Sequence, residues 1–126
     1  MPFRLLTTAV LALALIAGSA RAQTGPTTPL DENLARIAEI LGALQYLRGL
    51  CVSTEGAKWR TEMQALVEAE GTTVERKGRL TSAYNRGFRG FQQTYRSCTP
   101  AADLAIRRYL EEGARIAREI TARYSN

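Results

Sequence analysis

Apolar residues recur every three or four positions along most of this chain, and this spacing predicts four amphipathic helices. The first predicted helix starts at Thr28, a threonine that can cap it, followed by a proline suited to the first turn. The Asp31 carboxylate can accept hydrogen bonds from the free N–H groups of that turn. The helix ends near Gly49. Its apolar stripe is Leu34, Ile37, Leu41 and Leu44.

The second and the last predicted helices have similar start and stop signals. The second begins after Glu55 and stops at Gly71, the usual residue type for a left-handed helix cap. The last begins at Thr99, again a capping threonine followed by a proline. Their apolar positions are Trp59, Met63, Leu66 and Val67, and Ile106, Leu110, Gly113, Ala117, Ile120 and Tyr124. No segment shows the strict alternation of a half-buried strand.

The third predicted helix opens with a capping box at 72–75 and separates apolar from basic residues. At about 100° per residue, its aromatic side chains fall on one face and its arginines on the opposite face. Gly87 and Gly90 each cost about 1 kcal/mol relative to alanine, so they indicate a close approach of another backbone or a ligand, or else a bend. The apolar face is Leu80, Tyr84, Phe88, Phe91 and Tyr95, and the basic face is Arg79, Arg86, Arg89 and Arg96.

Four helices joined by short links pack most simply as antiparallel neighbours, so the sequence predicts an all-α, up-down-up-down, bundle-like array. In this path the first and third helices finish at the same end of the bundle, and those two helix ends carry Cys51 and Cys98. A disulfide between these cysteines fits the path, because its Cα atoms must lie within about 7 Å. A less regular four-helix array fits the same pattern.

The first 22 residues have a different pattern, which is typical of a secretory signal peptide. A basic residue, Arg4, precedes an apolar run from Leu5 to Ala17 and a small-x-small sequence that ends at Ala22. The run is shorter than the roughly 20 residues of a membrane-spanning helix, so a permanent anchor is the weaker interpretation. We expect three parts, namely a signal peptide at 1–22, a flexible lead-in at 23–29 and a single helical domain at 30–126 without a membrane span.

Export also changes the charge and the cysteine chemistry that the composition implies. Of the 17 basic and 12 acidic residues, Arg4 and Arg21 lie in the leader, so the net charge falls from +5 to about +3. Two cysteines in an oxidising compartment favour a disulfide over a reactive thiol pair, which usually has C-x-x-C spacing. We therefore expect a periplasmic or secreted protein that contains one disulfide.

The residue types restrict catalysis. The chain has no histidine, which excludes Ser-His-Asp triads and histidine–zinc sites, and a bonded cysteine pair is neither a metal ligand nor a nucleophile. Carboxylates remain at Glu68, Glu70, Glu111, Glu112 and Glu119. Helical neighbours one or two residues apart point to different sides, so we interpret these carboxylates as solvated helix charges. We expect no catalytic, cofactor-binding or metal-binding residues.

The arginine face of the third helix has two interpretations. Arginine offers a planar fork to phosphate or carboxylate, so the face can bind an anionic envelope polymer, such as lipopolysaccharide or peptidoglycan, or another envelope protein. It can equally be the solvated side of a core helix. Nucleic acid is a poorer partner, because export takes the chain away from it and the aromatic residues face the core.

Three classes of function remain on this basis. The first is a non-catalytic binding or structural factor of the bacterial cell envelope that acts through the arginine face. The second is a periplasmic chaperone of acid or other stress, because small disulfide-linked helical proteins can expose apolar surface at low pH. The third, which we favour least, is an enzyme that uses carboxylates.

Several segments resemble a family of small exported bacterial proteins that is known only as a domain of unknown function. The segments are 47–51 (LRGLC), 59–60 (WR), 84–91 (YNRGFRGF), 95–102 (YRSCTPAA) and 109–115 (YLEEGAR). They span nearly the whole mature chain. The resemblance implies an exported helical domain, and it implies no activity, cofactor or catalytic residue.

Overall fold

The structure is a computed structural model that describes residues 27–52 and 54–124. These ranges contain four helices and no strand, so the predicted all-α class is confirmed. The signal peptide predicted at 1–22 and most of the lead-in lie outside the described residues. The helices are α1 (Pro29–Cys51), α2 (Gly56–Glu70), α3 (Val74–Thr94) and α4 (Pro100–Tyr124).

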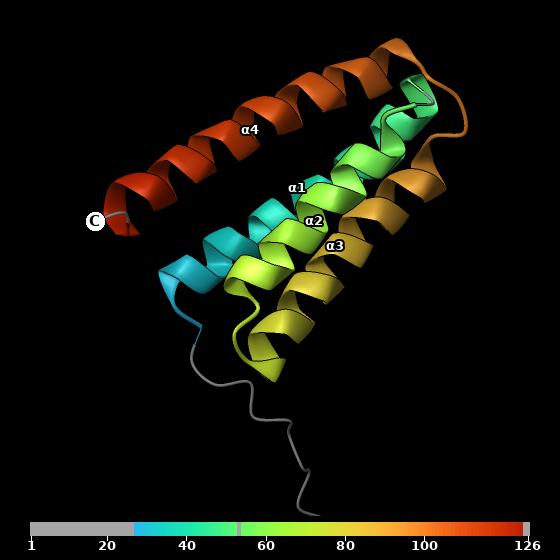
Figure 1. The fold of residues 1–126 in the computed structure, drawn as a ribbon. Coiled ribbons are helices and arrows are strands. Elements are labelled where there is room, and N and C mark those ends of the chain that lie inside the picture. Colours follow the sequence, from blue (N-terminus) through green and yellow to red (C-terminus); the bar gives the residue numbers. More distant parts are fainter. Residues whose placement is uncertain (1–26, 53, 125–126) are drawn as a thin grey trace, which may run out of the picture.

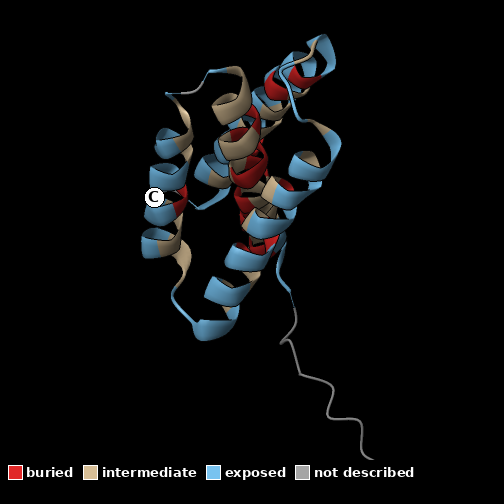
Figure 2. Ribbon diagram, turned by 90° about the vertical axis from the view of Figure 1, so that its right-hand side faces the viewer, coloured by how far each residue is buried: buried red, intermediate tan, exposed pale blue. Residues whose placement is uncertain are grey.

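Helix α1 is the centre of the fold, and the other three helices pack around it (Figure 1). Helices α2 and α3 also meet, whereas the α4 backbone comes close only to that of α1 within the described part of the chain. Figure 1 shows α4 on the opposite side of α1 from the other two helices, and Figure 2 shows the buried residues gathered in the middle of the array. The array is therefore less regular than a four-helix bundle in which each helix has two neighbours around one shared core.

The central position of α1 follows from its sequence, which is apolar on more than one side. The predicted stripe is at least partly buried throughout. Ile40 and Leu47 lie outside that stripe, and they are only 2% and 0% exposed. A helix with two apolar sides needs partners on both sides, so α1 becomes the middle layer rather than one wall of a bundle.

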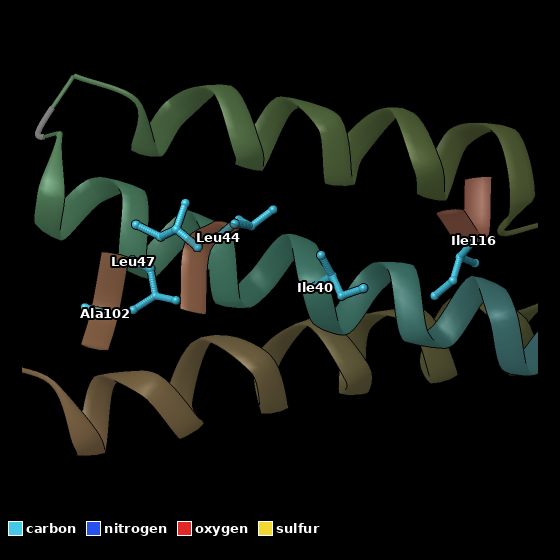
Figure 3. Close-up of a cluster of buried hydrophobic side chains, with 6 residues drawn as sticks. Ile40, Leu44, Leu47, Ala102 and Ile116 are labelled. Carbon is cyan, nitrogen blue, oxygen red and sulfur yellow. The ribbon is translucent and has the colours of Figure 1, made fainter. Parts of the chain in front are cut away.

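Two core clusters result, one on each side of α1. The first joins α1 to α4, and Figure 3 shows its α1 side chains reaching toward Ala102 and Ile116. The second joins α1 to α2 and α3. The buried members are Ile40, Leu44, Leu47, Ala102, Ile106 and Ile116 in the first cluster, and Leu34, Ala38, Met63, Leu80 and Ala83 in the second.

The buried face of α4 is rotated from the predicted one. Leu110 and Tyr124 are 40% and 50% exposed, although both belong to the predicted stripe. Ala102 and Ile116 are buried in their place. Apolar residues lie on both flanks of the shared position Ile106, so periodicity alone does not say which flank meets α1.

The helix ends show which local predictions hold. The Oγ1 atom of Thr28 accepts a hydrogen bond from the Asp31 N–H at 3.1 Å, and the Asp31 carboxylate accepts one from the Thr28 N–H at 3.2 Å, which confirms the predicted cap. Helix α1 continues to Cys51, beyond its predicted end. Helix α3 is capped by Thr73 alone rather than by a box, and Gly71 has a φ of −79°, which is not left-handed.

The predicted disulfide joins the end of α1 to the loop that follows α3. The Cα atoms of Cys51 and Cys98 lie 4.9 Å apart, and the sequence separation is 47 residues. In the chain-entropy model, closing a loop of this length stabilises the fold by about 4 kcal/mol. This is a large part of the net stability of a small domain.

Helices α1 and α3 make a close backbone contact at two facing glycines. A Cβ atom on Gly87 would lie 2.0 Å from the carbonyl oxygen of Glu39, and one on Gly42 would lie 2.0 Å from that of Tyr84. The sequence left three explanations open for Gly87, namely another backbone, a ligand or a bend. The structure shows that another backbone, that of α1, approaches it. Gly90 makes no such close contact, so its prediction as a close-packing position is wrong. It lies on the exposed side of α3, and a Cβ atom there would meet no atom within 4 Å.

The two α3 glycines should respond in opposite ways to alanine. Gly87→Ala should lower the free energy of unfolding by about 2 kcal/mol or more, because the added methyl group forces the two backbones apart. Gly90→Ala should raise it by about 0.5–1 kcal/mol, because alanine loses less backbone entropy than glycine in a helix. Urea denaturation followed by circular dichroism measures both changes. Equal effects of the two substitutions would contradict the close contact at Gly87.

Candidate functional site

Two of the four arginines in the predicted basic face lie beside carboxylates of α1. A guanidinium nitrogen of Arg79 is 3.8 Å from Oδ2 of Asp31, and one of Arg86 is 3.6 Å from Oε2 of Glu39. The Arg86 side chain remains 62% exposed, so its ion pair is a surface one. Neighbouring carboxylates nevertheless reduce the positive charge that this part of α3 presents to an external anion.

The other two arginines are separated from each other by the end of the helix. Arg89 is exposed on α3 and Arg96 is exposed in the loop that leads to Cys98, because α3 ends at Thr94. Neither side chain forms an ion pair with another described residue. The prediction that Arg96 belongs to the helical face is wrong, since the chain leaves the helix before it reaches the disulfide. The four arginines thus do not form one continuous binding face.

Asp31 is a buried carboxylate that connects the start of α1 to α3. It is 8% exposed and accepts hydrogen bonds from the Thr28 hydroxyl and from Nε of Arg76, both at 2.8 Å. Hydrogen bonds from Thr28, and then from Arg76, lower the pKa of the Asp31 carboxyl below its ordinary value against the opposing effect of burial. The capping role of Asp31 was predictable from the sequence, whereas its contact with Arg76, which is 45 residues away, was not.

A second ion-paired carboxylate, Glu112, joins α4 to α1, and we call the Asp31 and Glu112 contacts the two carboxylate clamps. Nε and Nη2 of Arg36 donate to the two carboxylate oxygens of Glu112 at 2.8 and 2.9 Å. The Arg36 guanidinium also lies 5.4 Å from the centre of the Tyr109 ring. The hydrogen bond from Arg36 lowers the pKa of the Glu112 carboxyl. Glu112 is therefore a bridging residue between two helices, and the prediction that it is only a solvated charge is wrong.

A groove of about 830 Å³ lies between α2 and α3, beside α1, and we call it the α2–α3 groove. Its apolar lining includes Met63, Val67 and Phe88, and its polar lining includes Gln45, Arg60 and Tyr84. A smaller hollow of about 350 Å³ shares Gln45, Arg60 and Phe88 with it and extends toward the end of α1. The volume lies within the range of small-molecule binding sites, about 300–1,000 Å³.

Two buried polar atoms of residues that line this groove have no hydrogen-bond partner among the described residues. They are Oε1 of Gln45 and the hydroxyl of Tyr84. An unpaired buried polar atom costs about 1–3 kcal/mol, and folded proteins keep few of them without water or a ligand as partner. A third such atom, Nε1 of Trp59, belongs to a side chain packed against the α1–α4 cluster.

The charges around the groove are mainly positive. Arg60 and Lys77 contribute two cationic side chains and Glu68 one carboxylate. Burial raises the pKa of the Tyr84 phenol, and the positive charge of Arg60 acts in the opposite direction. No other described residue forms an ion pair with Arg60. Arg60 is exposed, so its guanidinium is available to an anion at the groove.

Helical periodicity assigns Tyr84 and Phe88 to the core and gives no indication of the groove. Both side chains are only half-buried, because α2 does not cover this part of α3 fully. A signal was present in the sequence, since Gln45 is a polar residue next to the apolar stripe of α1. A half-buried glutamine on a helix that packs on two sides indicates a polar partner at that position.

Other kinds of site find little support among the residues described here. No helix in these ranges is long and apolar enough to cross a membrane. The same ranges contain no group of three or more side chains that could hold a metal ion. Glu119 is paired with Arg115 at 2.8 Å, four residues away on α4.

The unpaired Tyr84 hydroxyl gives a sharp test of stability. Tyr84→Phe should raise the free energy of unfolding by about 1 kcal/mol, because it removes a buried polar atom that has no partner in the fold. Tyr46→Phe is the matched control, because the Tyr46 hydroxyl donates to the carbonyl oxygen of Tyr95. This control should lose about 1 kcal/mol. Urea denaturation measures the stability of both variants. A loss of stability in both would contradict the claim that the Tyr84 hydroxyl has no hydrogen-bond partner in the fold.

The two carboxylate clamps should make the fold sensitive to acid. Asp31 and Glu112 have lowered pKa values in the folded chain, so the stability they contribute is present above the ordinary carboxyl pKa and is lost as the pH falls through the folded values. The unfolding free energy should start to fall below about pH 5. Asp31→Asn and Glu112→Gln should flatten this dependence in urea titrations, whereas Glu62→Gln, at an exposed position on α2, should leave it unchanged.

Comparison with known protein families adds one match. A family model described as "Protein of unknown function (DUF2385)" matches residues 29–124, which begin at the first residue of α1 and end at the last residue of α4. This match confirms the resemblance found in the sequence to a family known only as a domain of unknown function. No curated protein and no solved structure matches the chain. The chain therefore belongs to the DUF2385 family of proteins of unknown function.

Proposed function

We propose that this chain is an exported, non-catalytic binding factor of the bacterial cell envelope, and that the α2–α3 groove is its binding site. The observation that carries the proposal is the groove itself, whose volume of about 830 Å³ is that of a ligand site and whose lining has two cations, Arg60 and Lys77, against one carboxylate. An anionic group of a ligand would be attracted by these two cations and partly enclosed by the groove. Binding would therefore be favoured at this place over the rest of the surface.

Export is supported by two features of the chain. Residues 1–22 have the pattern of a signal peptide, and the disulfide between Cys51 and Cys98 is of the kind that persists in oxidising compartments. An up-down-up-down path accounts for the position of the disulfide at a shared end of α1 and α3. The proposal accordingly places the mature protein in the periplasm or outside the cell.

A binding role, rather than catalysis, is supported by the carboxylates. A carboxyl group that acts as a general acid near neutral pH needs a raised pKa. The pKa values of Asp31 and Glu112 are shifted the other way by their hydrogen bonds. Both groups act as fixed anions that hold helices together.

The charge of the groove supports an anionic partner. Arg60 and Lys77 outnumber the single carboxylate of Glu68 at the groove. The partner would be an anionic envelope polymer or another envelope protein that presents a carboxylate or phosphate. This interpretation moves the binding role from the arginine face predicted on α3 to the opposite flank of the same helix.

A second candidate function is a chaperone that acts under acid stress. It is favoured by the two clamps, because protonation of Asp31 and Glu112 would loosen α3 and α4 from α1 and expose apolar residues of the central helix. At low pH the chain would also carry a large positive charge, which opposes its own aggregation.

The proposal is tested by retention on isolated envelope material from cells that express the full chain with its leader. Arg60→Gln should reduce retention about tenfold, the loss expected when a hydrogen bond to a charged group is removed. The matched control is Arg118→Gln, the same change at an exposed position on α4, and it should retain normally. Equal retention of all three proteins, or an uncleaved leader, would contradict the proposal. Absence of retention together with protection of client proteins near pH 3 would favour the chaperone.

A further inference from the structure

Helix α4 has a second apolar stripe, which lies beside the face that packs against α1. Five residues without charge form this stripe, and all five are exposed. They follow one another at intervals of four, three, four and three residues, so they lie along one side of the helix. The stripe, which we call the α4 seam, consists of Leu110, Ala114, Ala117, Thr121 and Tyr124.

The spacing of the α4 seam is that of a coiled coil. Positions that alternate by four and three residues pack against the equivalent positions of another helix. A stripe this narrow is typical of a helix pair, whereas a helix on a globular core has a broader apolar face. On α4 the core face is a separate one, because Ile106 and Ile116 are buried against α1. The seam therefore has the pattern expected for contact with one further helix.

The middle of the seam can be buried without leaving a polar group unpaired. The Thr121 hydroxyl already donates to the carbonyl oxygen of Ala117 at 2.9 Å, so its methyl group is free to pack. Ala114 and Ala117 are small side chains, which let two helix backbones come close. Leu110 and Tyr124 lie at the two ends and supply most of the apolar area. This order is the same from either end, so the seam suits a copy of itself that runs in the opposite direction.

Two charged residues on one edge of the seam form no ion pair with another described residue. They are Glu111 and Arg118, which are exposed and occupy equivalent places in the coiled-coil repeat. The two arginines one turn from Glu111, namely Arg107 and Arg115, pair with other carboxylates of α4. This edge therefore offers one negative and one positive charge to a partner.

A second copy of α4 that runs antiparallel matches both the apolar residues and the charges. When the two helices cross midway between Ala114 and Ala117, each Ala114 faces Ala117 of the second copy. Glu111 then lies within about 3 Å, measured along the helix axis, of the second copy's Arg118, and the same pair forms twice. Interhelical pairs of this kind set the orientation of coiled-coil helices. A parallel pair would place like charges at the same level, so the charges favour the antiparallel one.

We infer that the protein forms a homodimer in which two α4 helices pack antiparallel through the α4 seam. Such a contact uses the same surface of both copies, so it closes at two. The inference goes beyond the proposed function, because α4 lies on the opposite side of α1 from the α2–α3 groove (Figure 1). Retention through the groove does not depend on the dimer, and Arg118→Gln should retain normally even where it weakens the dimer.

The test is sedimentation equilibrium of the exported protein with its disulfide intact, from about 10 μM to about 1 mM, a range that covers weak dimers. We expect a reversible equilibrium between monomer and dimer. Ala117→Glu should raise the dissociation constant about tenfold or more, because it buries two unpaired carboxylates in the seam. Ala117 is exposed in the monomer, so urea denaturation should show an unchanged fold. The matched control is Ala65→Glu, at an exposed position on α2, which should dimerise normally.

A reversal of charge tests the antiparallel arrangement itself. Glu111→Arg should raise the dissociation constant about tenfold, because it leaves only positive charges along the shared edge. Adding Arg118→Glu to this variant should restore the original affinity, because both pairs then form with their signs exchanged. A single monomeric species at every concentration, or a dimer that Ala117→Glu leaves intact, would overturn the inference. Failure of the double variant to recover would also contradict it.

Discussion

The close contact between the backbones of α1 and α3 is the constraint on which the rest of the structure depends. It exists because Gly42 and Gly87 carry no Cβ atom, and a methyl group on either would collide with a carbonyl oxygen of the other helix. The same helix pair is held near one end by the hydrogen bond between Asp31 and Arg76 and at the other end by the disulfide. Helices α2 and α4 thus pack onto a pair whose geometry is already fixed.

This pair also explains why a groove forms on one side of the fold. Helix α2 has 15 residues and α3 has 21, and both pack against α1 more extensively than against each other. The shorter helix leaves part of the α3 aromatic face uncovered, so Tyr84 and Phe88 line a hollow instead of filling a core. Gln45 belongs to the same region, and its Oε1 is buried there without a hydrogen-bond partner among the described residues.

Local features of the fold were predictable, and long-range ones were not. The caps at Thr28 and Thr99 depend on hydrogen bonds over three residues, so the sequence is sufficient to find them. The pair of Arg36 and Glu112 spans 76 residues and depends on which flank of α4 meets α1, which periodicity does not determine. The groove escaped prediction for a similar reason, since it depends on how fully α2 covers α3.

The way α4 is attached indicates that it separates from the fold before the other three helices do. This helix follows Cys98 in the chain, and among the described helices its backbone comes close only to α1, so it can detach while α1 and α3 remain covalently joined. Its departure would uncover the first cluster on the central helix, whereas the second cluster would lose only its contact with Ile120. Sub-global opening of this kind makes α4 the least protected of the four helices and leaves α1, α2 and α3 as a persistent unit.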